Sequence, residues 1–162
     1  IEGISGSLGH GIGMASGFIL ADRLDNIHRK HYVIIGDGEC YEGSVWESAM
    51  FANHHNMGEL VVIIDRNQLC ILGKTEDELS LGDLKNKWSS FGWNSQEING
   101  HDLDEIDEAL KLKFDNNKPT IIVANTVKGK GVSFMENNHS WHNKIPSEDQ
   151  FEVAFNELKM GI

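Results

Sequence analysis

The chain has 162 residues, the length of one ordinary domain, of which 40% are hydrophobic and 24% are charged. This composition is typical of a globular protein that buries a core, while a formal net charge of −11 argues against nucleic acid or an anionic membrane as a partner. No apolar run approaches the roughly 20 residues of a membrane-spanning helix, and two cysteines in separate segments suit a reducing, cytoplasmic setting.

The first half of the chain alternates helical and strand patterns. A glycine-rich start leads into a helix predicted over residues 8–24, and the apolar run at 32–35 predicts a strand. A second helix is predicted over 44–57 and a second strand over 60–64. Continuous apolar runs of this kind suit strands that are buried on both faces of a parallel sheet.

The second half repeats the alternation. Residues 91–98 predict a more polar strand at an edge of the sheet, and 103–114 predict a helix. A third apolar run at 120–124 predicts a buried strand, and 148–158 predict a last helix. Strands that alternate with helices predict an α/β fold, a parallel sheet flanked by helices, as a single domain over residues 1–162.

The first residues already belong to the glycine-rich segment, and a domain rarely begins on a loop that looks functional. We therefore expect a partial domain that lacks its first elements. A parallel sheet without these elements exposes apolar surface, so we also expect association or low solubility without a partner.

The residues that follow the first two predicted strands carry the chemistry. Gly36, Asp37 and Gly38 follow the first strand, and Asn67 follows the second. Ligands of open α/β sheets bind beyond the carboxyl ends of the strands, so Asp37 and Asn67 are expected to converge there. Carboxylate and amide oxygens suit Mg²⁺ or Ca²⁺, and glycines let a phosphate approach the backbone. The pattern predicts a site for a divalent cation and a phosphate group.

This pairing of Gly-Asp-Gly with a distant asparagine resembles the motif with which thiamine diphosphate (ThDP) enzymes bind their cofactor. The resemblance implies a cation, Mg²⁺ or Ca²⁺, held by the Asp37 carboxylate, the Asn67 amide oxygen and the main-chain carbonyl of Leu69. It also implies cofactor contacts from the motif and its neighbours, namely Gly36, Asp37, Gly38, Glu39 and Asn67.

Four further segments narrow the resemblance to the transketolase family. They are Ser-Gly-Ser-Leu-Gly-His-Gly at 5–11, Gly-Glu-Cys-Tyr-Glu-Gly at 38–43, Asn-Gly-His-Asp at 99–102, and the stretch 126–142. The first is similar to a segment that lines the cofactor, which implies contacts from Gly6 and Leu8. The last resembles the late active-site loop, which implies that His142 reaches both cofactor and substrate.

Glu42 and Glu47 stand near the start of the helix predicted over 44–57. The helix dipole alone accounts for acidic residues at that end. In transketolases, glutamates at the matching positions belong to a carboxylate network that links two active sites across a dimer. Both interpretations stay open. Under the second, these glutamates are catalytic residues together with His142, which could move protons at neutral pH.

The resemblance also implies a partner. In this family ThDP binds between two domains, and the second supplies the glutamate that activates the aminopyrimidine. The chain has no counterpart of that glutamate, which suggests one component of a split-subunit transketolase. The expected reaction is transfer of a ketol unit between sugar phosphates. It needs a pyrimidine-domain subunit or a second protomer.

Other functions fit less well or stay as alternatives. A shortened ThDP-binding or assembly module without catalysis of its own is the main alternative. A ThDP-dependent synthase or a 2-oxo-acid dehydrogenase component agrees less well with the segment 126–142. The early glycines do not form a dinucleotide fingerprint, because Ser16 stands where its last glycine belongs. Residues 128–131 lack the serine or threonine of a P-loop.

Overall fold

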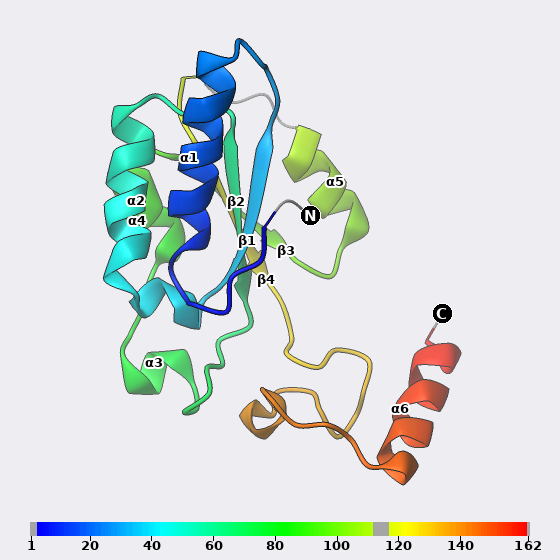
Figure 1. Ribbon diagram of the computed structural model, residues 1–162. Coiled ribbons are helices and arrows are strands. Elements are labelled where there is room, and N and C mark those ends of the chain that lie inside the picture. Colours follow the sequence, from blue (N-terminus) through cyan, green and yellow to red (C-terminus); the bar gives the residue numbers. More distant parts are fainter. Residues whose placement is uncertain (1–2, 112–116, 162) are drawn as a thin grey trace.

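The computed structural model (Figure 1) describes residues 3–111 and 117–161, and within these ranges four parallel strands form one sheet. The strands are β1 (His31–Gly36), β2 (Leu60–Arg66), β3 (Asn94–Asn99) and β4 (Thr120–Asn125), in the spatial order β1-β2-β4-β3. The apolar strands β2 and β4 are central and largely buried, and the more polar β3 lies at an edge. The predicted α/β fold and the polar edge strand are confirmed.

Helices precede and follow the strands along the chain. They are α1 (Gly11–Leu24), α2 (Gly43–His54), α3 (Thr75–Glu78), α4 (Leu84–Ser90), α5 (Leu103–Lys111) and α6 (Glu148–Met160), with the 3-10 turns η1 (Gly38–Tyr41) and η2 (His139–Trp141). The first helix begins later than predicted, because Gly9 has a left-handed φ of +81° that an α-helix cannot include. The second ends earlier, since Asn56 has a φ of +50°. The end predicted for the helix over 103–114 lies outside the described residues.

The segment between β2 and β3 holds two helices that the sequence patterns did not predict, α3 and α4. Asp83 caps α4 by accepting a 2.9 Å hydrogen bond from the amide of Asn86. Trp88 on this helix is fully buried and packs against Trp46 and Trp93, with ring centroids 5.3 and 4.8 Å away. α4 is therefore part of the core despite its mostly polar sequence.

The core is uneven on the two faces of the sheet. The larger cluster joins α1, α2 and α4 to one face, through residues such as Ile12, Val45 and Trp88. The smaller cluster joins α5 to the other face through Ala109 and its neighbours in β2, β3 and β4. Strand β1 receives little cover on that second face, where Tyr32 and Ile34 are 56% and 74% exposed.

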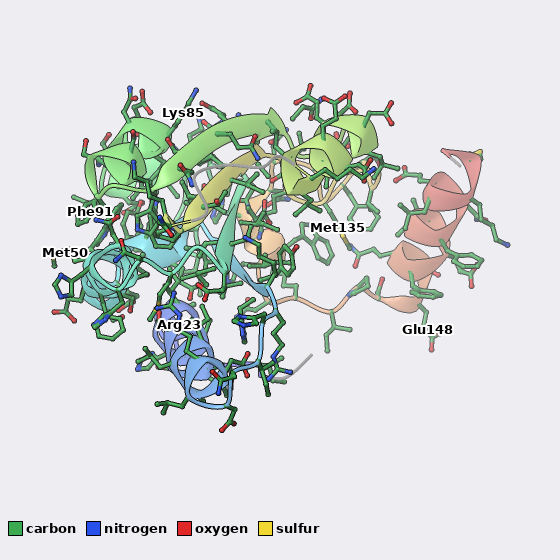
Figure 2. All side chains as sticks on the ribbon, turned by 90° about the horizontal axis from the view of Figure 1, so that it is seen from above. Arg23, Met50, Lys85, Phe91, Met135 and Glu148 are labelled. Carbon is green, nitrogen blue, oxygen red and sulfur yellow. The ribbon has the colours of Figure 1, made fainter. Side chains whose placement is uncertain are left out.

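The last helix, α6, stands apart from the sheet and its covering helices in both views, and Figure 2 marks its start with Glu148. It is tied to the preceding loop through Glu157, whose carboxylate accepts hydrogen bonds from the amide and hydroxyl of Ser133 at 2.7 and 2.6 Å. No helix in the described ranges is long and apolar enough to cross a membrane.

Candidate functional site

The carboxyl ends of β1 and β2 bring the two halves of the predicted cofactor motif together. Asp37 follows β1 and Asn67 follows β2, and the strands pair in parallel with Gly36 opposite Asp65. The main-chain amide of Gln68 donates a 2.7 Å hydrogen bond to Oδ2 of Asp37. The convergence expected from the strand ends is confirmed. Figure 1 shows it at the lower end of the sheet, near α3.

Asp37 is almost completely buried, with 1% of its surface exposed. Its Oδ1 accepts a hydrogen bond from the Gly38 amide at 2.8 Å, and its Oδ2 also accepts one from Nη1 of Arg66 at 3.2 Å. Burial raises the pKa of the Asp37 carboxyl above its ordinary value, while the Gln68 amide and the Arg66 charge oppose that rise. A cation bound at Asp37 would offset the cost of burying its negative charge.

The turn after β2 presents the other two predicted ligands. Oδ1 of Asn67 accepts a 3.0 Å hydrogen bond from the Leu69 amide, and Gln68 between them has a left-handed φ of +63°. No donor in the described ranges bonds the Leu69 carbonyl oxygen, which stays open to a ligand. One buried carboxylate, one amide oxygen and one carbonyl oxygen fit a hard cation such as Mg²⁺.

Metal-binding clusters of another kind are absent from the part of the chain that the structure describes. There, no group of three or more histidine, cysteine, aspartate or glutamate side chains could hold a metal ion. The predicted ligand set of Asp37, Asn67 and the Leu69 carbonyl has one charged ligand only, and therefore differs from a cluster of several acidic, histidine or cysteine side chains.

Glu39 fastens the glycine-rich segment to the end of β1. Its Oε1 accepts a 2.8 Å hydrogen bond from the Gly9 amide, and its Oε2 accepts a 3.4 Å bond from the Gly36 amide. The hydroxyl of Ser44 donates to the Gly9 carbonyl at 3.1 Å. A Cβ added at Gly9 would lie 2.4 Å from that hydroxyl oxygen, so this close approach requires glycine.

Gly6 and Leu8 belong to the same segment and are both exposed. A Cβ added at Gly6 would meet no atom within 4 Å, and 55% of the Leu8 surface is exposed. The segment thus presents an open surface beside the motif, while Glu39 holds its base.

The late loop, residues 126–142, begins beside the loop that follows β3. The amide of Val127 donates a 2.7 Å hydrogen bond to Nε2 of His101, and a Cβ added at Gly100 would lie 2.5 Å from the Thr126 methyl carbon. Further along, Phe134 contacts Trp141 with ring centroids 5.2 Å apart. The loop is therefore packed at its start and against itself.

His142 follows η2 in this loop and is exposed. No described residue forms a hydrogen bond with its side chain. The structure therefore leaves the imidazole open and does not place it against Asp37.

A family model described as "Transketolase, thiamine diphosphate binding domain" matches residues 1–161. The chain belongs to the transketolase family. It represents the ThDP-binding domain of that family, so the resemblance inferred from the motif and from the four flanking segments is confirmed.

Known transketolases resemble the chain in sequence and in fold. It is 41% identical to an apulose-4-phosphate transketolase subunit of Phocaeicola vulgatus, over 100% of the chain and 58% of that protein. It is also 41% identical to the 6-deoxy-6-sulfo-D-fructose transketolase subunit SqwG of a Clostridium strain, over 98% of the chain and 58% of that protein. The crystal structure of Campylobacter jejuni transketolase superposes with a TM-score of 0.83 at 28% identity, covering 94% of the chain and 24% of that structure. The chain thus spans somewhat over half of the two curated relatives, and its likeness to split-type subunits is confirmed.

The two glutamates of the transketolase pattern flank the start of α2. Glu42 is the residue that precedes the helix and makes no side-chain capping bond, and both Glu42 and Glu47 are exposed. The position of Glu42 at the start of α2 agrees with a favourable helix dipole, whereas Glu47 lies beyond the first turn, where that effect has fallen off. Both carboxylates are open to a partner. Their role in a carboxylate network stays a prediction.

Sequence patterns missed three transketolase-domain residues that support Asp37. Arg66, the last residue of β2, is 8% exposed and donates from Nη1 to both Asp37 and Thr75, at 3.2 and 3.0 Å. Its Nη2 donates to Oε1 of Glu76 at 2.6 Å. The one available signal was a charged residue at the end of an apolar strand, where a buried charge needs partners.

Proposed function

We propose that the chain is the diphosphate-binding component of a two-subunit transketolase, which transfers a ketol unit between sugar phosphates. One observation carries the proposal: Gln68 is hydrogen-bonded to the buried Asp37, so the two halves of the cofactor motif form one unit. The two relatives named as transketolase subunits add support, since each matches nearly the whole chain.

The proposed cation is Mg²⁺, or Ca²⁺ in its place, with Asp37, Asn67 and the Leu69 carbonyl as its protein ligands. Mg²⁺ commonly uses one or two carboxylates and completes its shell with water and phosphate oxygens, so this small set is sufficient. The cation would join the acidic motif to the diphosphate. ThDP, when bound, supplies the carbanion and the electron sink, and the protein holds and orients it.

The proposed partner is a pyrimidine-domain subunit, with a second protomer as the other possibility. The open carboxylates of Glu42 and Glu47 suit the network between two active sites. His142, exposed on the late loop, is proposed to exchange a proton with the substrate through its imidazole. Both cysteines are free, which suits a reducing compartment, and we propose a cytoplasmic location.

A second candidate is a ThDP-binding or assembly module without catalysis of its own. The open face of β1 favours it, because Tyr32 and Ile34 form apolar surface that an assembly partner would cover. The two candidates differ in turnover: only the first predicts ketol transfer once the pyrimidine-domain partner is added.

The test is a ThDP titration with and without Mg²⁺, on the chain alone and with its pyrimidine-domain partner, followed by ketol transfer. Metal-dependent binding and partner-dependent turnover are expected. Asp37→Asn should weaken binding of metal and cofactor together. Asp77→Asn, an exposed acid on α3, is the matched control and should change neither. The absence of ThDP binding even with the partner would refute the cofactor assignment.

A further inference from the structure

Arg66 connects the end of β2 to α3 through its guanidinium group. Only 10% of the Arg66 side chain is exposed. Nη1 reaches both Oδ2 of Asp37 and Oγ1 of Thr75, and Nη2 reaches Glu76. The planar fork of arginine can hold acceptors on two sides at once, which the single ammonium of lysine cannot do in the same geometry.

Glu76 extends this connection to the segment that precedes α4. Its Oε2 accepts hydrogen bonds from the Ser80 hydroxyl at 2.6 Å and the Gly82 amide at 3.2 Å. Its Oε1 accepts one from the Leu81 amide at 3.2 Å, beside the bond from Arg66. Residues 80–82 are thus joined to Asp37 through the side chains of Glu76 and Arg66.

We propose that Arg66 is a positioning residue that couples the segment 75–82 to the Asp37 carboxylate. Arg66 and the Gln68 amide both donate hydrogen bonds to Oδ2 of Asp37. Among the described donors, only the Gly38 amide donates to Oδ1. This arrangement fixes the rotamer of Asp37 and leaves Oδ1 with a lone pair for a cation. The purpose of the coupling rests on the proposed cation site; the coupling itself does not.

The anchoring of α3 makes the coupling testable. The Tyr41 hydroxyl donates a 2.7 Å hydrogen bond to the Thr75 carbonyl, so η1 holds α3 without help from Arg66. Removing the charge of Glu76 should therefore loosen the connection without displacing the helix. It also leaves Arg66 buried with Asp37 as its remaining charged partner, which changes the forces on that carboxylate.

The first experiment measures amide hydrogen exchange in the ligand-free chain. Glu76→Gln should speed exchange at Leu81 and Gly82, which it contacts, and about tenfold at the Gln68 amide, which it does not contact. Glu78→Gln, in the same helix, is the matched control and should leave Gln68 unchanged. Faster exchange at Leu81 and Gly82 with an unchanged Gln68 would overturn the coupling.

The second experiment measures Mg²⁺-dependent ThDP binding, with Arg66→Met as the test variant and Arg66→Lys as the variant that keeps the charge. Arg66→Met should weaken ThDP binding about tenfold, the effect of one lost charge-assisted hydrogen bond. Arg66→Lys should bind ThDP more tightly than Arg66→Met and less tightly than the wild type. Binding unchanged in a folded Arg66→Met protein would overturn the positioning role. If Arg66→Met does not fold, Glu76→Gln takes its place. If the unaltered chain binds no ThDP with its partner, the proposed function fails, while the exchange experiment still decides the coupling.

Discussion

His101 accepts a hydrogen bond at Nε2 from the main-chain amide of Val127, at a distance of 2.7 Å. An imidazole nitrogen accepts such a bond through its in-plane lone pair, so the ring orientation of His101 is set by the Val127 amide. The bond joins the loop after β3 to the start of the late loop, which carries His142.

Replacement of His101 by phenylalanine should loosen the late loop. The variant leaves the Val127 amide without its acceptor, at a cost of about 1 kcal/mol in the free energy of unfolding. Proteolysis of the ligand-free protein within residues 128–138 should become faster. His101→Gln keeps an acceptor in its amide oxygen, so its cleavage rate should lie between those of the wild type and of His101→Phe. Equal cleavage rates in all three proteins would show that the bond does not hold the loop.

Replacement of Gly9 by alanine should be costly. The left-handed φ of +81° strains any side chain, and the added Cβ would lie 2.4 Å from Oγ of Ser44. Backbone strain of this kind costs about 1–3 kcal/mol, and the expected result is lower stability and weaker ThDP binding. Gly17→Ala is the matched control, because Gly17 lies inside α1 and a Cβ there meets no atom within 4 Å.

Gly17→Ala should instead stabilise the protein by about 0.5–1 kcal/mol, since alanine is more favourable than glycine in a helix interior. Urea unfolding of both variants gives the comparison. A Gly9→Ala protein as stable as Gly17→Ala would contradict the close packing of the glycine-rich segment against α2.

Asp22 should make the stability of the protein depend on pH in the acidic range. The two-pronged hydrogen bond from Arg29, together with the bond from His31, lowers the pKa of the Asp22 carboxyl from 3.8 to about 2. A carboxyl with a lowered pKa in the folded state stabilises the fold above its ordinary pKa. That contribution is lost as the pH falls from about 4 towards 2.

The measurement is urea unfolding of the wild type and of Asp22→Asn between pH 7 and pH 2. The wild type should lose stability relative to the variant as the pH falls through this window. Parallel curves across the whole range would show that Asp22 does not contribute in this way.

The sequence was sufficient for the part of the site that depends on parallel strands. Asp37 and the turn at 67–69 meet because each follows a buried strand, and the carboxyl ends of paired parallel strands lie together. The hydrophobic runs located the strand ends, the residues Asp37 and Asn67 that follow them indicated a cation site, and the transketolase resemblance added the cofactor.

The supporting contacts could not be predicted in the same way. Arg66 and Glu76 meet only because the chain reverses after β2, with a left-handed Gln68 that no composition rule requires. α4 was missed because its sequence is mostly polar. Its place in the core comes from Trp88, which is buried by partners distant in the sequence. Such contacts depend on tertiary structure, which local propensity does not encode.

Two neighbouring tryptophans should respond differently to replacement by phenylalanine. Nε1 of Trp93 donates a 3.0 Å hydrogen bond to the Ala49 carbonyl, whereas the buried Nε1 of Trp88 has no partner in the described ranges. Trp93→Phe loses packing and also a buried hydrogen bond. Trp88→Phe loses packing but removes an unsatisfied donor, and a buried unpaired polar group costs about 1–3 kcal/mol.

We therefore expect Trp88→Phe to destabilise the protein less than Trp93→Phe, by about 1 kcal/mol or more. Urea unfolding followed by far-UV circular dichroism measures both without relying on tryptophan fluorescence. An equal or larger loss for Trp88→Phe would mean that packing around this ring outweighs the unpaired donor.

Replacement of Ile34 by lysine tests the open face of β1. Ile34 is 74% exposed and Tyr32 beside it is 56% exposed, at the edge of a four-stranded parallel sheet. Exposed apolar residues on an edge strand promote association, and a lysine there opposes it. Sedimentation should show less self-association for Ile34→Lys than for the wild type, with a similar unfolding midpoint because no core contact is lost. The matched control, Ile35→Lys, places the charge at a residue that is 2% exposed and should unfold the protein instead. A wild type that sediments as a stable monomer would show that this face needs no cover.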